Sequence, residues 1–171
     1  MNSLAILAAE RGDKERSVEI FGRSLATLRR VHGETPNLAR MEHNVGAVLM
    51  ASKRYDEALP YMQRAVEVAI KTHGASNSTL AFFRRKLGWT LCELARYDEA
   101  ETELRLALKT FEAGKVGTNL MATRGDLACI ALKRDRNPAA RADIIAAMEF
   151  LEKNDADADH IDLLRRCLSE T

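Results

Sequence analysis

Arg54-Tyr55-Asp56-Glu57-Ala58 recurs almost unchanged as Arg96-Tyr97-Asp98-Glu99-Ala100, 42 residues further along the chain. In both stretches an aromatic residue precedes an acidic pair and an alanine. Acidic side chains stabilise the first turn of a helix, because they lie next to the positive end of the helix dipole. The two stretches therefore predict the beginnings of two equivalent helices in an internal repeat.

The repeat extends to both sides of these stretches. Each unit has a small residue at the position of Ala58 and Ala100. A second small residue lies twelve positions before this one, and a third lies seven positions after it. A large apolar residue lies four positions after it. The first small residues are Ala5, Gly46, Gly88 and Ala128, at spacings of 41, 42 and 40. The later positions hold Ser17, Ala58, Ala100 and Ala140, then Phe21, Met62, Leu104 and Ile144, then Ser24, Ala65, Ala107 and Ala147. A period of about 40 residues is typical of a solenoid.

Each unit contains two amphipathic helices. In the second unit, Met41, Val45, Val48 and Leu49 follow the i, i+4, i+7, i+8 spacing of one helical face. The stretch 55–70 keeps the same period in a second helix. The small residues are expected where the two helices cross, since bulky side chains would hold the axes further apart than the usual separation of about 8–10 Å.

The ends of these helices also have sequence signals. Glycines follow three of the periodic stretches, at Gly33, Gly74 and Gly114. We expect each to end a helix in the left-handed conformation, which glycine adopts most easily. Short polar side chains that can accept a hydrogen bond from a free backbone N–H then predict the next N-caps, at Asn77 or Ser78 and at Thr118 or Asn119.

The composition agrees with a helical core and argues against several classes of function. Of the 171 residues, 46% are hydrophobic and only 5% aromatic, so small aliphatic side chains must form a closely packed helical core. The formal net charge of +1 argues against a general nucleic-acid-binding protein, for which a basic excess is typical. No apolar run approaches the ~18 residues of a membrane span, and no secretory signal is recognisable. The three cysteines are far apart, which favours a reducing compartment, so we expect a cytoplasmic protein.

The sequence resembles the tetratricopeptide repeat family over roughly residues 4–152. The resemblance lies in the spacing of the small residues and in the aromatic residue before Asp-Glu-Ala. Units of 40 to 42 residues are similar to the long variant of kinesin light chains and many bacterial regulatory proteins. Gly33-Glu34-Thr35-Pro36 matches the loop of that variant, whereas Gly74-Ala75-Ser76-Asn77 keeps the glycine and lacks the proline.

We therefore predict an all-α fold, a right-handed solenoid of about four helix pairs with a C-terminal capping helix. The repeat array covers residues 1–153, with units at about 1–33, 34–75, 76–115 and 116–153. Residues 154–171 hold an acidic linker and the capping helix. The first unit starts with only the last part of its first helix, at about residues 3–10.

The resemblance implies that the first helix of each unit lines a concave groove. The inward positions are Arg40, His43 and Asn44 in the second unit, Arg85, Lys86 and Trp89 in the third, and Asp126 and Lys133 in the fourth. Asn44 stands where family members commonly carry an asparagine that bonds the backbone of a ligand. The cations Arg40, Arg85 and Lys86 favour an acidic partner. Trp89 either anchors a peptide or packs between neighbouring helices.

Other kinds of site are not expected. The carboxylate clamp, by which some family members bind chaperone C-termini, is matched only by Asn44 and Lys86. Cys92 and Cys129 are interpreted as buried structural thiols, because metal sites usually show close-spaced ligand pairs such as C-x2-C. The acidic run that begins at Asp155 lacks the glycine and the final glutamate that a calcium loop requires. We therefore expect no metal and no cofactor.

The predicted function is a non-catalytic scaffold that binds a partner peptide or helix in the groove, with an acidic partner as one candidate. Phosphate-binding, zinc-protease and nucleophile-elbow motifs are absent from the sequence, so an enzyme is not expected. One alternative is a regulatory segment of a larger signalling protein, attached for example to a kinase or a transcription regulator. Another is a self-associating repeat module. We expect a monomer or weak self-association, without nucleic-acid or membrane partners.

Overall fold

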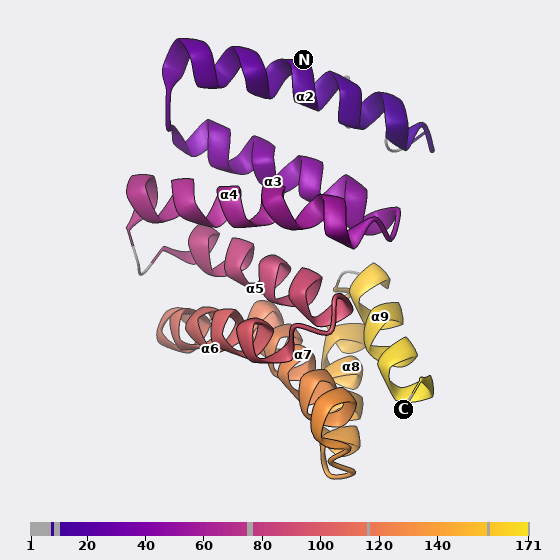
Figure 1. Cartoon of the computed structure of the whole chain (residues 1–171). Helices are drawn as coiled ribbons and strands as arrows, with labels where there is room; N and C mark the ends of the chain where they lie inside the picture. The colour runs from indigo at the N-terminus through magenta and orange to yellow at the C-terminus, as the bar shows by residue number, and fades with distance from the viewer. Residues whose placement is uncertain (1–7, 9–10, 75–76, 116, 157, 171) are drawn as a thin grey trace.

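The computed structural model describes residues 8, 11–74, 77–115, 117–156 and 158–170. Over these ranges every regular element is a helix. The helices are α2 (Lys14–His32), α3 (Pro36–Ala51), α4 (Tyr55–His73), α5 (Ser78–Glu93), α6 (Tyr97–Gly114), α7 (Gly117–Asp135), α8 (Ala140–Lys153) and α9 (Ala158–Ser169). They stack in chain order from α2 at one end to α7, α8 and α9 at the other (Figure 1). The predicted all-α solenoid is confirmed, while the short helix expected at about residues 3–10 lies, except for Ala8, outside the described residues.

The small residues of the repeat lie at the predicted helix crossings. A Cβ added to Gly46 of α3 would stand 2.8 Å from Met62 Cε of α4. A Cβ added to Gly88 of α5 would stand 2.7 Å from Leu104 Cγ of α6 and 3.1 Å from the carbonyl oxygen of Ala100. A side chain at either glycine would therefore push its two helices apart, which explains the period of the repeat.

The N-caps agree with the prediction in one loop and differ in the other. The side chain of Thr35 accepts a hydrogen bond from the third residue of α3 at 3.3 Å, and Asn77 accepts one from the second residue of α5 at 2.7 Å. Thr118 and Asn119 were expected to cap α7, but α7 already begins at Gly117, so both lie inside its first turn. The prediction of an N-cap at these two residues is therefore wrong.

The glycine signals also need correction. Gly33 and Gly74 follow α2 and α4 with φ of 63° and 80°, but their ψ values of −147° and 163° lie outside the left-handed helical region. Gly114 is the last residue of α6, and Lys115 takes the left-handed conformation with φ 52° and ψ 36°. The helix extends one residue beyond the expected stop, because the backbone N–H of Lys115 bonds the last carbonyls of α6.

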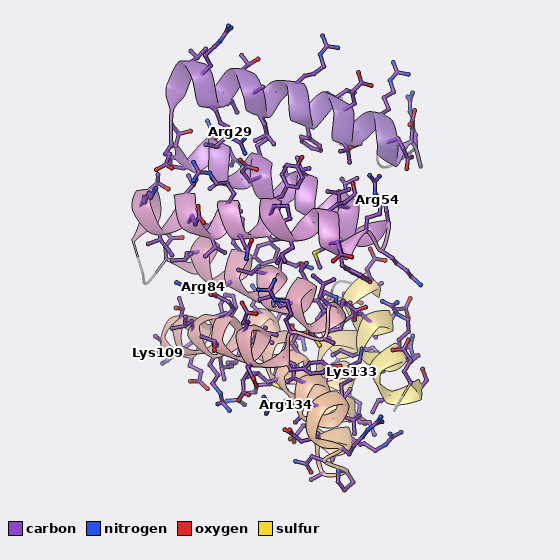
Figure 2. The ribbon with its side chains drawn as sticks, in the orientation of Figure 1. Arg29, Arg54, Arg84, Lys109, Lys133 and Arg134 are labelled. Carbon is purple, nitrogen blue, oxygen red and sulfur yellow. The ribbon has the colours of Figure 1, made fainter. Side chains whose placement is uncertain are left out.

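A partly buried ion pair joins α2 to α3. Glu42 of α3 is fully buried, and the Arg29 Nε of α2 lies 3.2 Å from its Oε1. Figure 2 shows Arg29 between the two helices. Burial raises the pKa of Glu42, against the opposing effect of the Arg29 guanidinium.

The helices form two layers along the stack. α3, α5, α7 and α9 contact one another in sequence and form the inner layer, while α4, α6 and α8 each pack against the inner helices on either side. α9 buries Ile161, Leu164 and Cys167 against α7 and α8. It therefore occupies the place that the first helix of a fifth unit would take. No helix within the described residues combines the length and the apolar character that crossing a bilayer requires.

Candidate binding groove

The inner layer lines a cavity of about 640 Å³ that is open to solvent. Its walls come from α3 and the loop that follows it, from α5, from α7 and from α9. Polar and aromatic side chains line much of it, including Arg85, Lys86, Trp89, Asp126, His160 and Arg166. In Figure 1, α9 lies beside the C-terminal end of α5, where it closes the groove on one side.

A buried ion pair forms the floor of this cavity. Arg85 Nη1 of α5 lies 3.4 Å from Asp126 Oδ2 of α7, and their side chains are 5% and 1% exposed. Burial raises the pKa of Asp126 to about 6, although the Arg85 guanidinium opposes this shift. Sequence reasoning expected Arg85 to offer positive charge to a ligand. The structure instead neutralises it from within the protein, because the fold brings an acidic residue of the next unit against it.

His160 of α9 completes this buried cluster. Its Nε2 lies 3.3 Å from Arg85 Nη1 and 3.3 Å from Asp126 Oδ1, and its ring also hydrogen-bonds the backbone of Ala122. Burial and the nearby cations Arg85 and Lys86 lower the pKa of His160 to about 2, so the ring is neutral. Since arginine can only donate, Nε2 is the acceptor of the bond from Arg85. Asp126 Oδ1 then has no hydrogen-bond donor among the described residues.

Trp89 packs between helices and also borders the cavity. Its side chain is 4% exposed, and its ring meets the His160 ring edge-on, with centroids 6.3 Å apart and planes at 78°. Edge-to-face contacts of this kind add to the stabilisation that burial provides. Of the two roles that the sequence left open for Trp89, the structure shows the packing role directly, and the cavity leaves room for contact with a ligand.

His43, Asn44 and Lys86 lie on or next to an aromatic cluster formed by Phe82 and Phe83, and of the three only Lys86 also lines the cavity. His43 is buried and stacks on Phe83 at 4.7 Å between centroids, with Phe82 at 5.2 Å. Burial lowers the pKa of His43 to about 4, so it is a neutral packing residue at physiological pH. Asn44 Oδ1 lies 3.4 Å from His43 Nδ1, and Lys86 Nζ lies 5.8 Å from the Phe82 ring centroid.

The remaining two predicted residues lie apart from the cavity. Arg40 is exposed, and its guanidinium donates to the Asn37 side chain of the same helix. Lys133 Nζ lies 3.6 Å from Glu93 Oε1 of α5 and 3.6 Å from Glu170 Oε2, which follows α9. Lys133 therefore joins three parts of the chain and takes part in the inner packing.

The structure thus gathers Arg85, Lys86, Trp89 and Asp126 around one cavity and leaves the other four predicted residues outside its lining. Sequence reasoning missed the contribution of α9, above all that of His160. A signal was present, because inner and outer helices alternate strictly and the helix after α8 must therefore join the inner layer. Within the described residues, no group of histidine, cysteine and acidic side chains is arranged to hold a metal ion.

Solved structures with the same fold are numerous. A kinesin-light-chain-type protein of Podosopora anserina with nearly identical TPR-like repeats has a TM-score of 0.73 at 14% identity, covering 99% of this chain and 85% of that one. The apo form of RapI has a TM-score of 0.75 at 21% identity, covering 90% and 55%. A Rap protein complexed with competence and sporulation factor has a TM-score of 0.69 at 17% identity, covering 94% and 44%. At these identities the likeness concerns the fold alone.

Sequence comparison gives the family. No curated protein matches the chain. Two models of the tetratricopeptide repeat match it, one over residues 37–113 and the other over residues 1–37. The matched residues include the Gly46 and Gly88 crossings that set the repeat. The chain belongs to the tetratricopeptide repeat family.

Proposed function

We propose that this chain is a non-catalytic interaction module that binds a segment of a partner protein or a peptide in the cavity of its inner layer. The observation that carries the proposal is the cavity itself, about 640 Å³ in volume and lined by Trp89 and by side chains of both charges. Sites for small ligands commonly measure about 300–1,000 Å³, which leaves room here for a few residues of a peptide. The Rap neighbour that is complexed with competence and sporulation factor offers a parallel on the same fold.

The cavity has a positive side and a negative side. Lys53 and Lys86 come from the α3–α4 loop and from α5, whereas α9 contributes Asp159 and Asp162 together with one basic side chain, Arg166. Arg85 adds no net charge, since Asp126 compensates it. A partner segment with an acidic residue therefore fits with that residue toward Lys86, and its neighbouring basic or amide groups fit toward α9.

A binding role also agrees with the chemistry of the buried cluster. His160 lies beside Asp126, as the general-base histidine of many hydrolases lies beside an aspartate. The pKa of His160, however, is lowered to about 2 by burial and by Arg85. A ring that cannot take up a proton at neutral pH is unsuitable as a general base. The cluster therefore serves to hold α5, α7 and α9 together around the cavity.

Charge reversal at Lys86 tests the proposal. Lys86→Glu is compared with Lys109→Glu, because Lys109 is an exposed lysine of α6 on the opposite side of the molecule from α9 (Figure 2). Partners captured from a lysate of the source cells are identified by mass spectrometry, with circular dichroism as the check on folding. We expect a partner that the unmodified chain and Lys109→Glu retain and that Lys86→Glu loses. Equal capture by all three proteins would contradict a site in this cavity.

A further inference from the structure

Two cations of α4 hold the carboxylate of a neighbouring loop. Arg64 Nη2 and Lys71 Nζ lie 2.8 Å and 2.9 Å from the two carboxylate oxygens of Glu34, which stands in the loop between α2 and α3. Arg64 and Lys71 are two turns apart, so both project from one face of the helix. Hydrogen bonds between charged groups are among the strong ones in proteins. The two side chains therefore act together as a binding site for one carboxylate.

α2 carries the same pair of cations at the equivalent positions. Both helices contain 19 residues, and α4 begins and ends 41 positions after α2. With this offset, Arg23 of α2 takes the place of Arg64, and Arg30 takes the place of Lys71. Arg23 and Arg30 are exposed, and neither has an ion pair with a described residue. The stretch 20–33 holds no acidic residue that could compensate them.

The two other outer helices lack the pair. In α6 the same positions hold Leu106 and Ala113, and the loop before α5, residues 74–77, has no acidic residue. α8 has a single cation there, Lys153. Among the described outer helices, the full pair therefore occurs on α2 and α4, and on α4 its role is to bind a carboxylate.

The helix face around this pair is open on α2. Thr27 lies one turn from both arginines and is exposed, whereas Val68, its equivalent on α4, is completely buried. Val31, one turn further along, is 59% exposed, the highest value among the large apolar side chains that the structure describes. Figure 1 shows α2 at one end of the stack, with α3 along one side of it. A surface that the fold covers on α4 is thus accessible on α2.

We propose that Arg23, Thr27, Arg30 and Val31 form a second docking surface, which binds an acidic segment of a partner protein. A carboxylate of that segment lies between Arg23 and Arg30, as Glu34 lies between Arg64 and Lys71, and an apolar side chain beside it contacts Val31. Since exposed ion pairs contribute little each, the binding is weak and falls with added salt. The surface goes beyond the proposed function, because α2 contributes no residue to the cavity lining.

Nuclear magnetic resonance with an acidic peptide tests the proposal. Octaglutamate with blocked ends is titrated into the ¹⁵N-labelled chain at low ionic strength. We expect the amide signals of residues 23–31 and the side-chain Nε–H signals of Arg23 and Arg30 to shift, with a dissociation constant on the order of 1 mM. Added salt should reverse the shifts. Shifts at the cavity residues instead, or shifts spread evenly over the exposed cations, would overturn the proposal.

Paired variants separate this surface from the effect of net charge. Replacing Arg23 and Arg30 together by Gln should weaken the binding of octaglutamate by roughly fivefold or more. The matched control replaces Lys109 and Arg136, two exposed cations for which no ion pair is found among the described residues, by Gln and should retain the binding. Equal weakening in both double variants would overturn the proposal, because the probe would then respond only to total charge.

A variant of the cavity distinguishes this surface from the site proposed above. Lys86→Glu removes a cation that lines the cavity and should still bind octaglutamate on α2. If Lys86→Glu loses the shifts, octaglutamate binds in the cavity, which overturns the second docking surface and leaves the proposed function intact. Circular dichroism checks the folding of each variant, and the titration of the unmodified chain decides the matter if one of them fails to fold.

Discussion

Arg85 and Asp126 are 41 residues apart in the sequence and 3.4 Å apart in the structure, and both are almost excluded from water. Each belongs to the inner helix of a different repeat unit. The two units are therefore joined by a polar contact as well as by the apolar core. His160 adds a third helix to the same contact, so one buried cluster holds α5, α7 and α9 in place.

Removing one member of this pair should be costly. Arg85→Ala leaves the Asp126 carboxylate buried without its cation, and we expect a loss of about 3–5 kcal/mol in the free energy of unfolding, measured with urea. Replacing both residues by Leu should cost less than Arg85→Ala alone, since no buried charge then remains. As a control, Arg105→Ala breaks an exposed pair with Glu101 and should change stability by about 0.5 kcal/mol or less. Equal losses at Arg85 and Arg105 would mean that the inner pair is accessible to water.

The pH dependence of stability should have a component from His43. Its pKa is lowered from 6.5 to about 4 by burial, so between these values the unfolded chain binds a proton that the folded chain does not. This component of stability is therefore present above pH 6.5 and is lost as the pH falls toward 4, with a slope of up to about 1.4 kcal/mol per pH unit. His43→Gln should reduce the slope by this amount, as measured by urea unfolding between pH 7 and pH 4.5. Parallel profiles for the two proteins would show that His43 takes up a proton in the folded state.

Asp126 changes the stability with pH in the opposite direction to His43, over part of the same pH range. Its pKa is raised from 3.8 to about 6, so the folded chain binds a proton that the unfolded chain releases between these values. The folded protein favours the protonated Asp126 carboxyl group over the charged one. The contribution of Asp126 to stability is therefore lost as the pH rises through 6. Asp126→Asn should therefore steepen the loss of stability below pH 6. A profile in the variant that is flatter than in the unmodified chain would place the pKa of Asp126 below its usual value.

The sequence could predict the residues at the helix crossings, but it could not predict the ion pair in the cavity. Gly46 and Gly88 could be recognised because the separation of two helix axes permits little choice of residue type at a crossing. The pairing of Arg85 with Asp126 could not be foreseen, because the repeat register tells which face a residue is on and not how closely two units approach. A cation on an inner face can equally meet solvent, a ligand or the next helix. Only the position of α7 decides between these outcomes.

The crossing between α5 and α6 should not tolerate a larger residue. Ala100 is fully buried, and its carbonyl oxygen lies 3.1 Å from the position of a Cβ added to Gly88. Ala100→Leu should lower the free energy of unfolding by about 1–3 kcal/mol through overpacking. Ala113→Leu makes the same chemical change at an exposed position of α6 and should have little effect. An unchanged melting temperature for Ala100→Leu would contradict the small-residue register of the whole array.

Trp89 should report the position of α9. It is the single tryptophan of the chain, it is buried, and its ring contacts His160 of α9. His160→Ala removes that contact and the bond to Arg85, so water should reach the indole and the fluorescence emission should move to longer wavelength. Glu149→Ala, at an exposed position of α8, is the control and should leave the emission maximum unchanged. If His160→Ala emits at the same wavelength as the unmodified chain, α9 is held closed by its apolar residues alone, and the polar cluster has no part in shaping the cavity.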